Sequence, residues 1–181
     1  LATFTVPVKA QLATDSWSFG FGFKYPRFLS SNTSPLNSNY GAYLSLQRNF
    51  SEHVGLRFKA AYGHLEGEFT SPLTGVNTTV SNFISGNLDL MYYLIPCEPV
   101  SPYVFGGGGA AYRMLDNYAT TTLDENAVVG KVNAGFGVEW TVSPEWKFVT
   151  EADYNLTLNS ELDGALGVNE VNGKDTYLAL N

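Results

Sequence analysis

One segment late in the chain carries oxygen-bearing side chains at the spacing of a calcium-binding loop. Counted from Asn159, carboxylates stand at positions 3, 5 and 12 (Glu161, Asp163 and Glu170), and a glycine stands at position 6. Carboxylate and amide oxygens are the ligands that Ca²⁺ prefers, and glycine at position 6 permits the turn that wraps the ion. However, strand patterns instead of helices flank the segment, and a hydrated acidic loop explains the same residues. Ca²⁺ is the one cofactor that the sequence suggests.

Histidine chemistry is the second possibility. The chain has 2 histidines, His53 and His64. Nucleophilic catalysis requires a nucleophile, a base and an orienting acid, and His64 with Glu66 or Glu68 and a nearby serine could form such a site. An enzyme with its active site at His64 is therefore one alternative. The sequence holds no Gly-x-Ser-x-Gly motif, no metal-spaced histidine pair and no phosphate loop, so we expect no enzymatic activity.

Composition narrows the class of protein that could position such side chains. Charged residues are 15% of the chain, below the quarter or so of soluble domains, and aromatic residues are 14%. The aromatic content excludes a disordered chain, and the net charge of −7 disfavours nucleic acid as a partner. No run reaches the roughly 18 apolar residues that a membrane-spanning helix needs. An aromatic-rich, glycine-rich all-β chain remains.

Eight stretches alternate apolar and polar residues with the period of two that is typical of β-strands. The clearest is residues 17–24, in which four aromatic residues alternate with serine, glycine and lysine. The other strands are expected over 40–47, 54–63, 84–94, 103–114, 131–140, 146–156 and 175–181. Short links (49–53, 95–101 and 142–145) alternate with long polar links (26–39, 64–79, 115–127 and 159–174). Short turns at one end and long loops at the other are the layout of an outer-membrane barrel.

The two faces of these strands differ in chemistry. One face is apolar, and the other carries glycines, serines and nearly balanced charges, which are Lys24, Arg57, Lys59, Asp89, Lys131, Glu139, Lys147, Glu151 and Asp153. Buried charges persist when they are paired, so this face is predicted to line a narrow lumen while the apolar face contacts lipid. A soluble lipocalin-like barrel that binds a small ligand would reverse the two faces, and it is the other alternative.

Three segments carry a resemblance to a known family: Phe19-Gly20-Phe21-Gly22-Phe23, Pro102-Tyr103-Val104-Phe105-Gly106-Gly107 and Gly135-Phe136-Gly137-Val138-Glu139-Trp140. Over residues 15–181 the chain resembles the eight-stranded transmembrane domain of the outer-membrane protein A family. The resemblance implies an all-β, antiparallel, up-and-down transmembrane barrel in the bacterial outer membrane, in contact with lipid and lipopolysaccharide. With its lumen filled by paired charges, such a monomeric barrel would brace the membrane and pass at most small ions through a gate. Some eight-stranded barrels modify lipid A, so the enzyme alternative at His64 would be a barrel enzyme that modifies lipid A.

The expected domain organisation has two parts. Residues 1–15 are expected to form an N-terminal periplasmic segment, and residues 16–181 the barrel. The last strand is expected to be incomplete, because barrels of the family close with an aromatic residue and this strand halts at Leu180 and Asn181. A periplasmic wall-binding domain, absent from this sequence, is a possible partner.

The long links carry acidic residues, which are Glu66, Glu68, Asp116, Asp124, Glu125, Glu161, Asp163, Glu170 and Asp175. Divalent cations are therefore expected to bridge this end of the barrel to anionic lipopolysaccharide.

The calcium hypothesis predicts a saturable rise of the thermal unfolding temperature as Ca²⁺ is added. The substitutions Glu170→Gln and Asp163→Asn should abolish the rise, because each removes a ligand charge. If Na⁺ at the same ionic strength gives an equal response, the effect is screening and the site does not exist.

Overall fold

The computed structural model describes residues 15–29, 34–35, 39–71, 75–116, 126–158 and 176–181. The strands are β1 (Ser16–Phe28), β2 (Ser34–Pro35), β3 (Tyr40–Asn49), β4 (Val54–Ser71), β5 (Gly75–Tyr93), β6 (Val100–Asp116), β7 (Asn126–Thr141), β8 (Lys147–Thr157) and β9 (Thr176–Leu180). The described part of the chain contains no helix that is long and apolar enough to cross a membrane.

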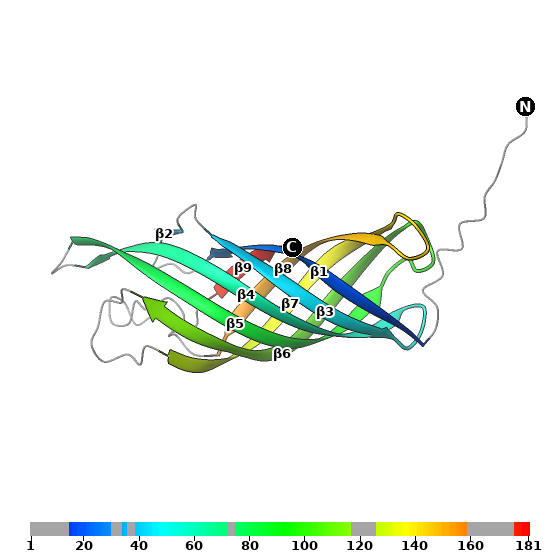
Figure 1. The fold of residues 1–181 in the computed structure, drawn as a ribbon, viewed down its shortest axis with the longest axis horizontal. Coiled ribbons are helices and arrows are strands. Elements are labelled where there is room, and N and C mark those ends of the chain that lie inside the picture. Colours follow the sequence, from blue (N-terminus) through cyan, green and yellow to red (C-terminus); the bar gives the residue numbers. More distant parts are fainter. Residues whose placement is uncertain (1–14, 30–33, 36–38, 72–74, 117–125, 159–175) are drawn as a thin grey trace, which may run out of the picture.

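The strands close into a barrel (Figure 1). The sheet order is β2-β4-β3-β1-β9-β8-β7-β6-β5, every pairing is antiparallel, and β5 also pairs with β4, which completes the ring. The two-residue strand β2 lies outside the ring, where it pairs with Gly67 and Glu68 of β4. The ring therefore has eight strands, and the prediction of an all-β, eight-stranded antiparallel barrel is confirmed.

Strand β9 bridges the seam between β1 and β8 in the half of the barrel that lies toward the long links. It pairs with Tyr25–Phe28 of β1 and with Ala152–Leu156 of β8. Beyond β9, the backbones of Asn181 and Glu151 exchange two hydrogen bonds of 3.0 Å. Among the described residues, Ser16–Lys24 of β1 pairs with β3 alone.

The link predicted over residues 64–79 is mostly strand, so this part of the prediction is wrong. The β4–β5 ladder continues without interruption to the pair Ser71 and Gly75. Residues 67–79 are mainly polar, with serine, threonine and asparagine in both phases. The apolar alternation therefore ends near residue 66, although the backbone of these residues still forms a regular antiparallel ladder.

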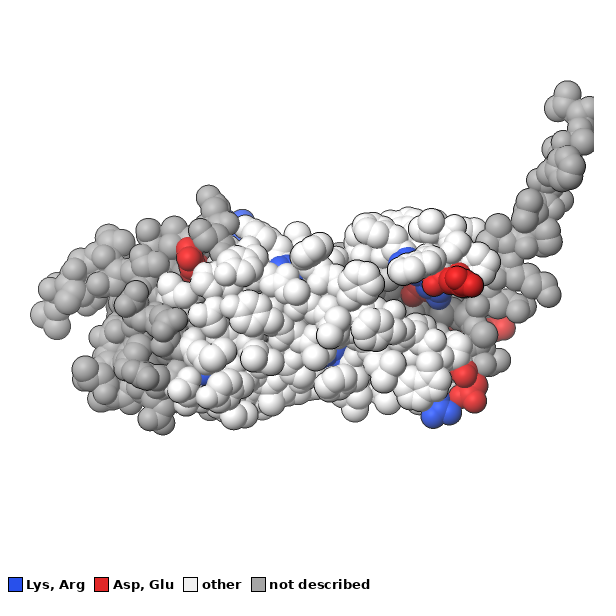
Figure 2. All heavy atoms as spheres, in the orientation of Figure 1, with Lys and Arg blue, Asp and Glu red and all other residues white. Residues whose placement is uncertain are grey.

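The outward face of the barrel is apolar, as the lipid-facing prediction requires. Large hydrophobic side chains are exposed along every long strand, including Phe21, Leu44, Phe58, Leu90 and Phe136. On the face that Figure 2 shows, most of the barrel wall is uncharged, a few Lys or Arg atoms are visible on it, and the acidic residues lie toward the two ends. A soluble ligand-binding cup would present the opposite arrangement, so the structure disfavours that alternative.

Exposed tyrosines and tryptophans form two belts on this face. Toward the short turns lie Trp17, Tyr92 and Trp146, and toward the long links lie Tyr40, Tyr62 and Tyr112. Aromatic girdles at both membrane interfaces are a feature of transmembrane barrels.

Aromatic side chains in the lumen lie over glycines of the neighbouring strand. Four such cross-strand pairs occur among the described residues: Gly22 with Tyr43, Gly63 with Phe83, Gly135 with Phe105 and Gly137 with Tyr103. A methyl group added at Gly63 would lie 2.3 Å from the Phe83 ring. The glycines therefore provide the space in which these rings fill the narrow interior.

This arrangement predicts that Gly135→Ala destabilises the barrel. The added methyl would lie 2.3 Å from the backbone oxygen of Ala152 and 2.5 Å from the Phe105 ring. We expect a loss of about 1–3 kcal/mol in the free energy of unfolding from lipid vesicles in urea, the usual cost of overpacking. Ala134→Val, which enlarges the adjacent outward side chain, is the control and should have little effect. Equal stability of the two variants would contradict the account.

Candidate functional site

Charged side chains gather inside the barrel because the strands alternate inward and outward positions. Eight of the nine predicted lumen residues are buried there: Lys24 on β1, Arg57 and Lys59 on β4, Asp89 on β5, Lys131 and Glu139 on β7, and Glu151 and Asp153 on β8. Lys147 differs, since its side chain is 30% exposed. It is the first residue of β8, and it contacts the lumen charges through its ion pair with Glu139 without being buried as they are.

Glu151 is the centre of the network. One carboxylate oxygen accepts hydrogen bonds from the Arg57 guanidinium and from the Tyr103 hydroxyl, the latter at 2.7 Å. The other oxygen accepts from Lys59 Nζ at 2.5 Å and from the Asn181 amide at 3.4 Å. Because β4 and β8 are four strands apart in a ring of eight, the Arg57 and Lys59 contacts cross the full width of the lumen.

Asp89 extends the network to two more walls of the barrel. Its Oδ2 accepts a hydrogen bond from Arg57 Nη2 at 3.1 Å, and its Oδ1 accepts one from Asn133 Nδ2 at 2.8 Å. The Arg57 guanidinium also lies over the Phe105 ring, 4.8 Å from the ring centre. Each charged side chain of this network therefore contacts a side chain of opposite charge, and Arg57 contacts two carboxylates.

A separate group of contacts lies at the turn end. Glu139 forms an ion pair with Lys147 and accepts a hydrogen bond from the Tyr93 hydroxyl at 3.0 Å. That hydroxyl in turn accepts one from the Gln47 amide at 2.8 Å. Glu139 thus connects the exposed mouth of the lumen to the buried aromatic residues behind it.

Lys131 and Lys24 lie closer to the long links. Lys131 Nζ donates to Asn155 Oδ1 and to the Tyr177 hydroxyl, both at 3.0 Å, and more weakly to the Ser85 hydroxyl at 3.5 Å. Lys24 Nζ lies 3.5 Å from Asp153 Oδ2. Both lysines contact the Tyr177 ring, with Nζ at 5.6 and 5.5 Å from its centre.

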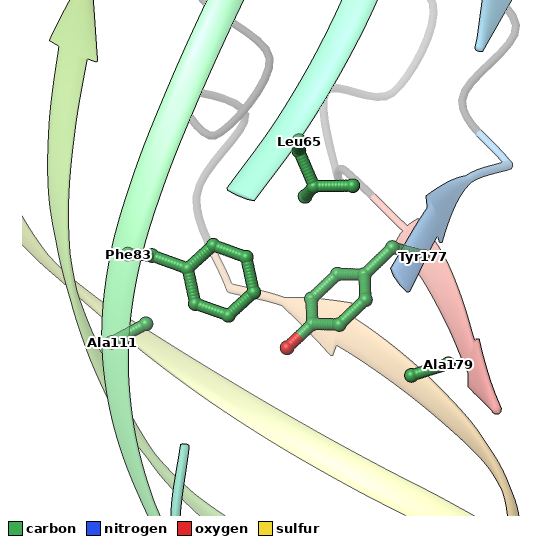
Figure 3. Packing of buried hydrophobic residues seen from close by; sticks show 5 residues of the cluster. All are labelled: Leu65, Phe83, Ala111, Tyr177 and Ala179. Carbon is green, nitrogen blue, oxygen red and sulfur yellow. The ribbon is translucent and has the colours of Figure 1, made fainter. Parts of the chain in front are cut away.

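Two hydrophobic clusters fill the lumen on either side of the charges. Toward the turns lie Met91, Tyr93, Tyr103 and Phe105. Toward the long links lie Leu65, Phe83, Ala111, Tyr177 and Ala179, which point toward one another in Figure 3. The order of residues along β5, with Met91, then Asp89, then Phe83, places the charged layer between the two clusters. Buried side chains therefore occupy the described lumen at all three of these levels.

Several lumen residues were missed by the sequence analysis. Arg113 is fully buried, and Asn133, Asn155 and Tyr177 contribute hydrogen bonds. The glycine run at 106–109 hides the alternation of β6, but counting by two from Tyr103 would have found Arg113. Asn155 lies in the same inward phase as Glu151 and Asp153, so the same count would have found it.

The histidine hypothesis receives limited support. His64 lies on the outward face of β4, where its Nε2 is 3.1 Å from Glu66 Oε1 and its Nδ1 is 2.7 Å from Asn82 Oδ1. The Tyr40 ring stacks on it at 4.7 Å. No serine hydroxyl is among these contacts, and the side chain of Glu68 is not described. In the described part of the chain, His64 therefore lacks the nucleophile that the enzyme alternative requires.

The predicted metal ligands Asn159, Glu161, Asp163 and Glu170 lie outside the described residues. Within the described ranges, no group of three or more histidine, cysteine, aspartate or glutamate side chains could hold a metal ion.

Comparison with known proteins identifies the fold. No protein-family model matches the chain, and no curated protein sequence matches it significantly. Among solved structures, the outer membrane protein OprG of Pseudomonas aeruginosa aligns with a TM-score of 0.57 and 12% identity over 95% of this chain and 91% of that one. Ail, the attachment invasion locus protein of Yersinia pestis, aligns with a TM-score of 0.52 and 15% identity over 92% and 95%.

A second structure of Ail, in complex with the heparin analogue sucrose octasulfate, aligns with a TM-score of 0.50. At these identities the likeness concerns the fold, and the chain has the eight-stranded barrel fold of outer-membrane proteins.

The Glu151 contacts predict that Glu151→Gln is strongly destabilising. The change leaves Lys59 and part of Arg57 buried without their counter-charge, and breaking a buried pair in this way costs about 3–5 kcal/mol. Asp15→Asn, which removes the exposed partner of Arg48, should cost about 0–1 kcal/mol. Urea unfolding from lipid vesicles measures both, and a Glu151→Gln effect as small as the Asp15→Asn effect would show that the network is not stabilising.

Proposed function

We propose that this protein is a structural barrel that spans and braces the bacterial outer membrane, and that it passes at most small ions through a gate of paired charges. The observation that carries the proposal is the pair of contacts from Arg57 and Lys59 to Glu151, which cross the lumen between opposite strands. Side chains that span the interior leave no wide channel while they remain paired.

The distribution of polarity supports the membrane location. The outward face is apolar between two aromatic belts, and the inward face holds the charges. A chain with this arrangement is stable where lipid surrounds it, because every backbone group of a closed barrel is paired within the sheet. Lipid and lipopolysaccharide are the proposed partners, with divalent cations between the acidic loops and the lipopolysaccharide. Membership of the outer-membrane protein A family remains a prediction.

The shared contacts of Arg57 suggest how the gate would open. Arg57 contacts both Glu151 and Asp89, so it can leave Glu151 and still keep a counter-charge at Asp89. Exchange between partners costs less than exposure of an unpaired charge. The passage of ions through the lumen would therefore be brief and infrequent.

Planar-bilayer recording of the folded protein tests this proposal. We expect small, flickering conductance events, and we expect Glu139→Ala to enlarge them because it frees Lys147 and Tyr93 at the turn end. Arg48→Ala, a change on the outward face, is the control and should leave the events unchanged. Large and stable conductance of porin size in the unmodified protein would refute the gate.

A further inference from the structure

Among the lumen charges whose contacts are described above, five cations face four carboxylates. Each of the four described lumen acids has a cationic partner: Asp89 has Arg57, Glu139 has Lys147, Glu151 has Arg57 and Lys59, and Asp153 has Lys24. Among the described residues, the hydrogen-bond partners of Lys131 are instead three neutral oxygens, those of Ser85, Asn155 and Tyr177, and no carboxylate forms an ion pair with it. Lys131 is 2% exposed.

A second buried ammonium group, that of Lys24, lies near Lys131. Lys24 contacts the same tyrosine ring, and its Nζ is buried with no hydrogen-bond partner in the described structure. An ion that enters from the end of the barrel that carries the long links meets these two lysines before it reaches the Glu151 network.

We propose that Lys131 makes the passage selective for small inorganic anions, which it holds together with Lys24 beside the Tyr177 ring. This inference rests on the proposed ion passage and names the ions that use it. A buried ammonium without a counter-charge is costly, and a monovalent anion such as chloride would neutralise it. The two lysines together leave one net positive charge for the anion to neutralise, because Asp153 neutralises Lys24.

The acidic residues of the long links act in the opposite direction, since they attract cations to the mouth of the barrel. A high salt concentration separates the contribution of the acidic long links from that of the lumen lysines. At 1 M salt the screening length is about 3 Å, so charges exposed to solvent are screened while the buried charges of the lumen are screened much less. Selectivity at high salt therefore reports on the lumen.

The experiment measures the reversal potential of single conductance events in a KCl gradient at high salt. We expect chloride to be more permeant than potassium, and we expect Lys131→Gln to reduce or reverse this preference. Lys131→Arg, which keeps the charge, should preserve it, and Arg48→Gln on the outward face should not alter it. Small events that favour potassium in the unmodified protein would overturn the inference and leave the proposed gate intact.

A second measurement does not depend on conduction. The thermal unfolding temperature is compared in chloride and in gluconate at equal ionic strength. Higher stability in chloride that is lost in Lys131→Gln and kept in Lys131→Arg supports an anion at this lysine, even if no events are recorded. Equal stability in the two salts, together with the absence of anion preference, overturns it.

Discussion

A charge inside a membrane-embedded barrel can be neutralised only from within the barrel, because the surrounding lipid offers neither counter-ions nor hydrogen bonds. The contacts of Glu151 satisfy this constraint. Three cationic or hydroxyl groups from β4 and β6 converge on one carboxylate of β8. These contacts join opposite walls, so the same interaction that removes the cost of the buried charges also closes the lumen.

The glycines have a complementary role. An eight-stranded barrel has space for few large side chains, and the rings of Tyr43, Phe83, Tyr103 and Phe105 each lie over a glycine of the adjacent strand. These rings fill the interior above and below the charged layer. The position of the charges and the exclusion of a wide channel therefore depend on residues that have no charge themselves.

Much of the fold could be predicted from the sequence, for a physical reason. A strand with lipid on one side and a filled lumen on the other must alternate in polarity, and Trp17–Lys24 and residues 131–140 show this alternation clearly. Beyond the membrane band both faces of a strand are polar. The extension of the β4–β5 ladder to Ser71 and Gly75 therefore shows no apolar–polar alternation in the sequence.

The contacts within the site were less accessible to sequence analysis. Alternation indicates that Lys131, Glu139 and Glu151 face inward, but the choice of partner depends on the stagger of strands that are distant in sequence. Arg57 and Glu151 are 94 residues apart, and nothing in either segment identifies the other. The burial of Arg113 was hidden by the glycine run before it. Lys147 has the correct phase, but its place at the end of β8 determines its exposure.

The assignment of the two faces is the central claim, and spin labels placed singly along β7 in lipid vesicles test it most directly. With Cys97 replaced by serine, labels at positions 132–138 should show oxygen accessibility that alternates with a period of two. The maxima should fall at Val132, Ala134 and Phe136, which the structure exposes, and a polar nickel reagent should not reach them. Labels at these three positions that are accessible to the polar reagent, with no access to oxygen from the lipid, would contradict the account.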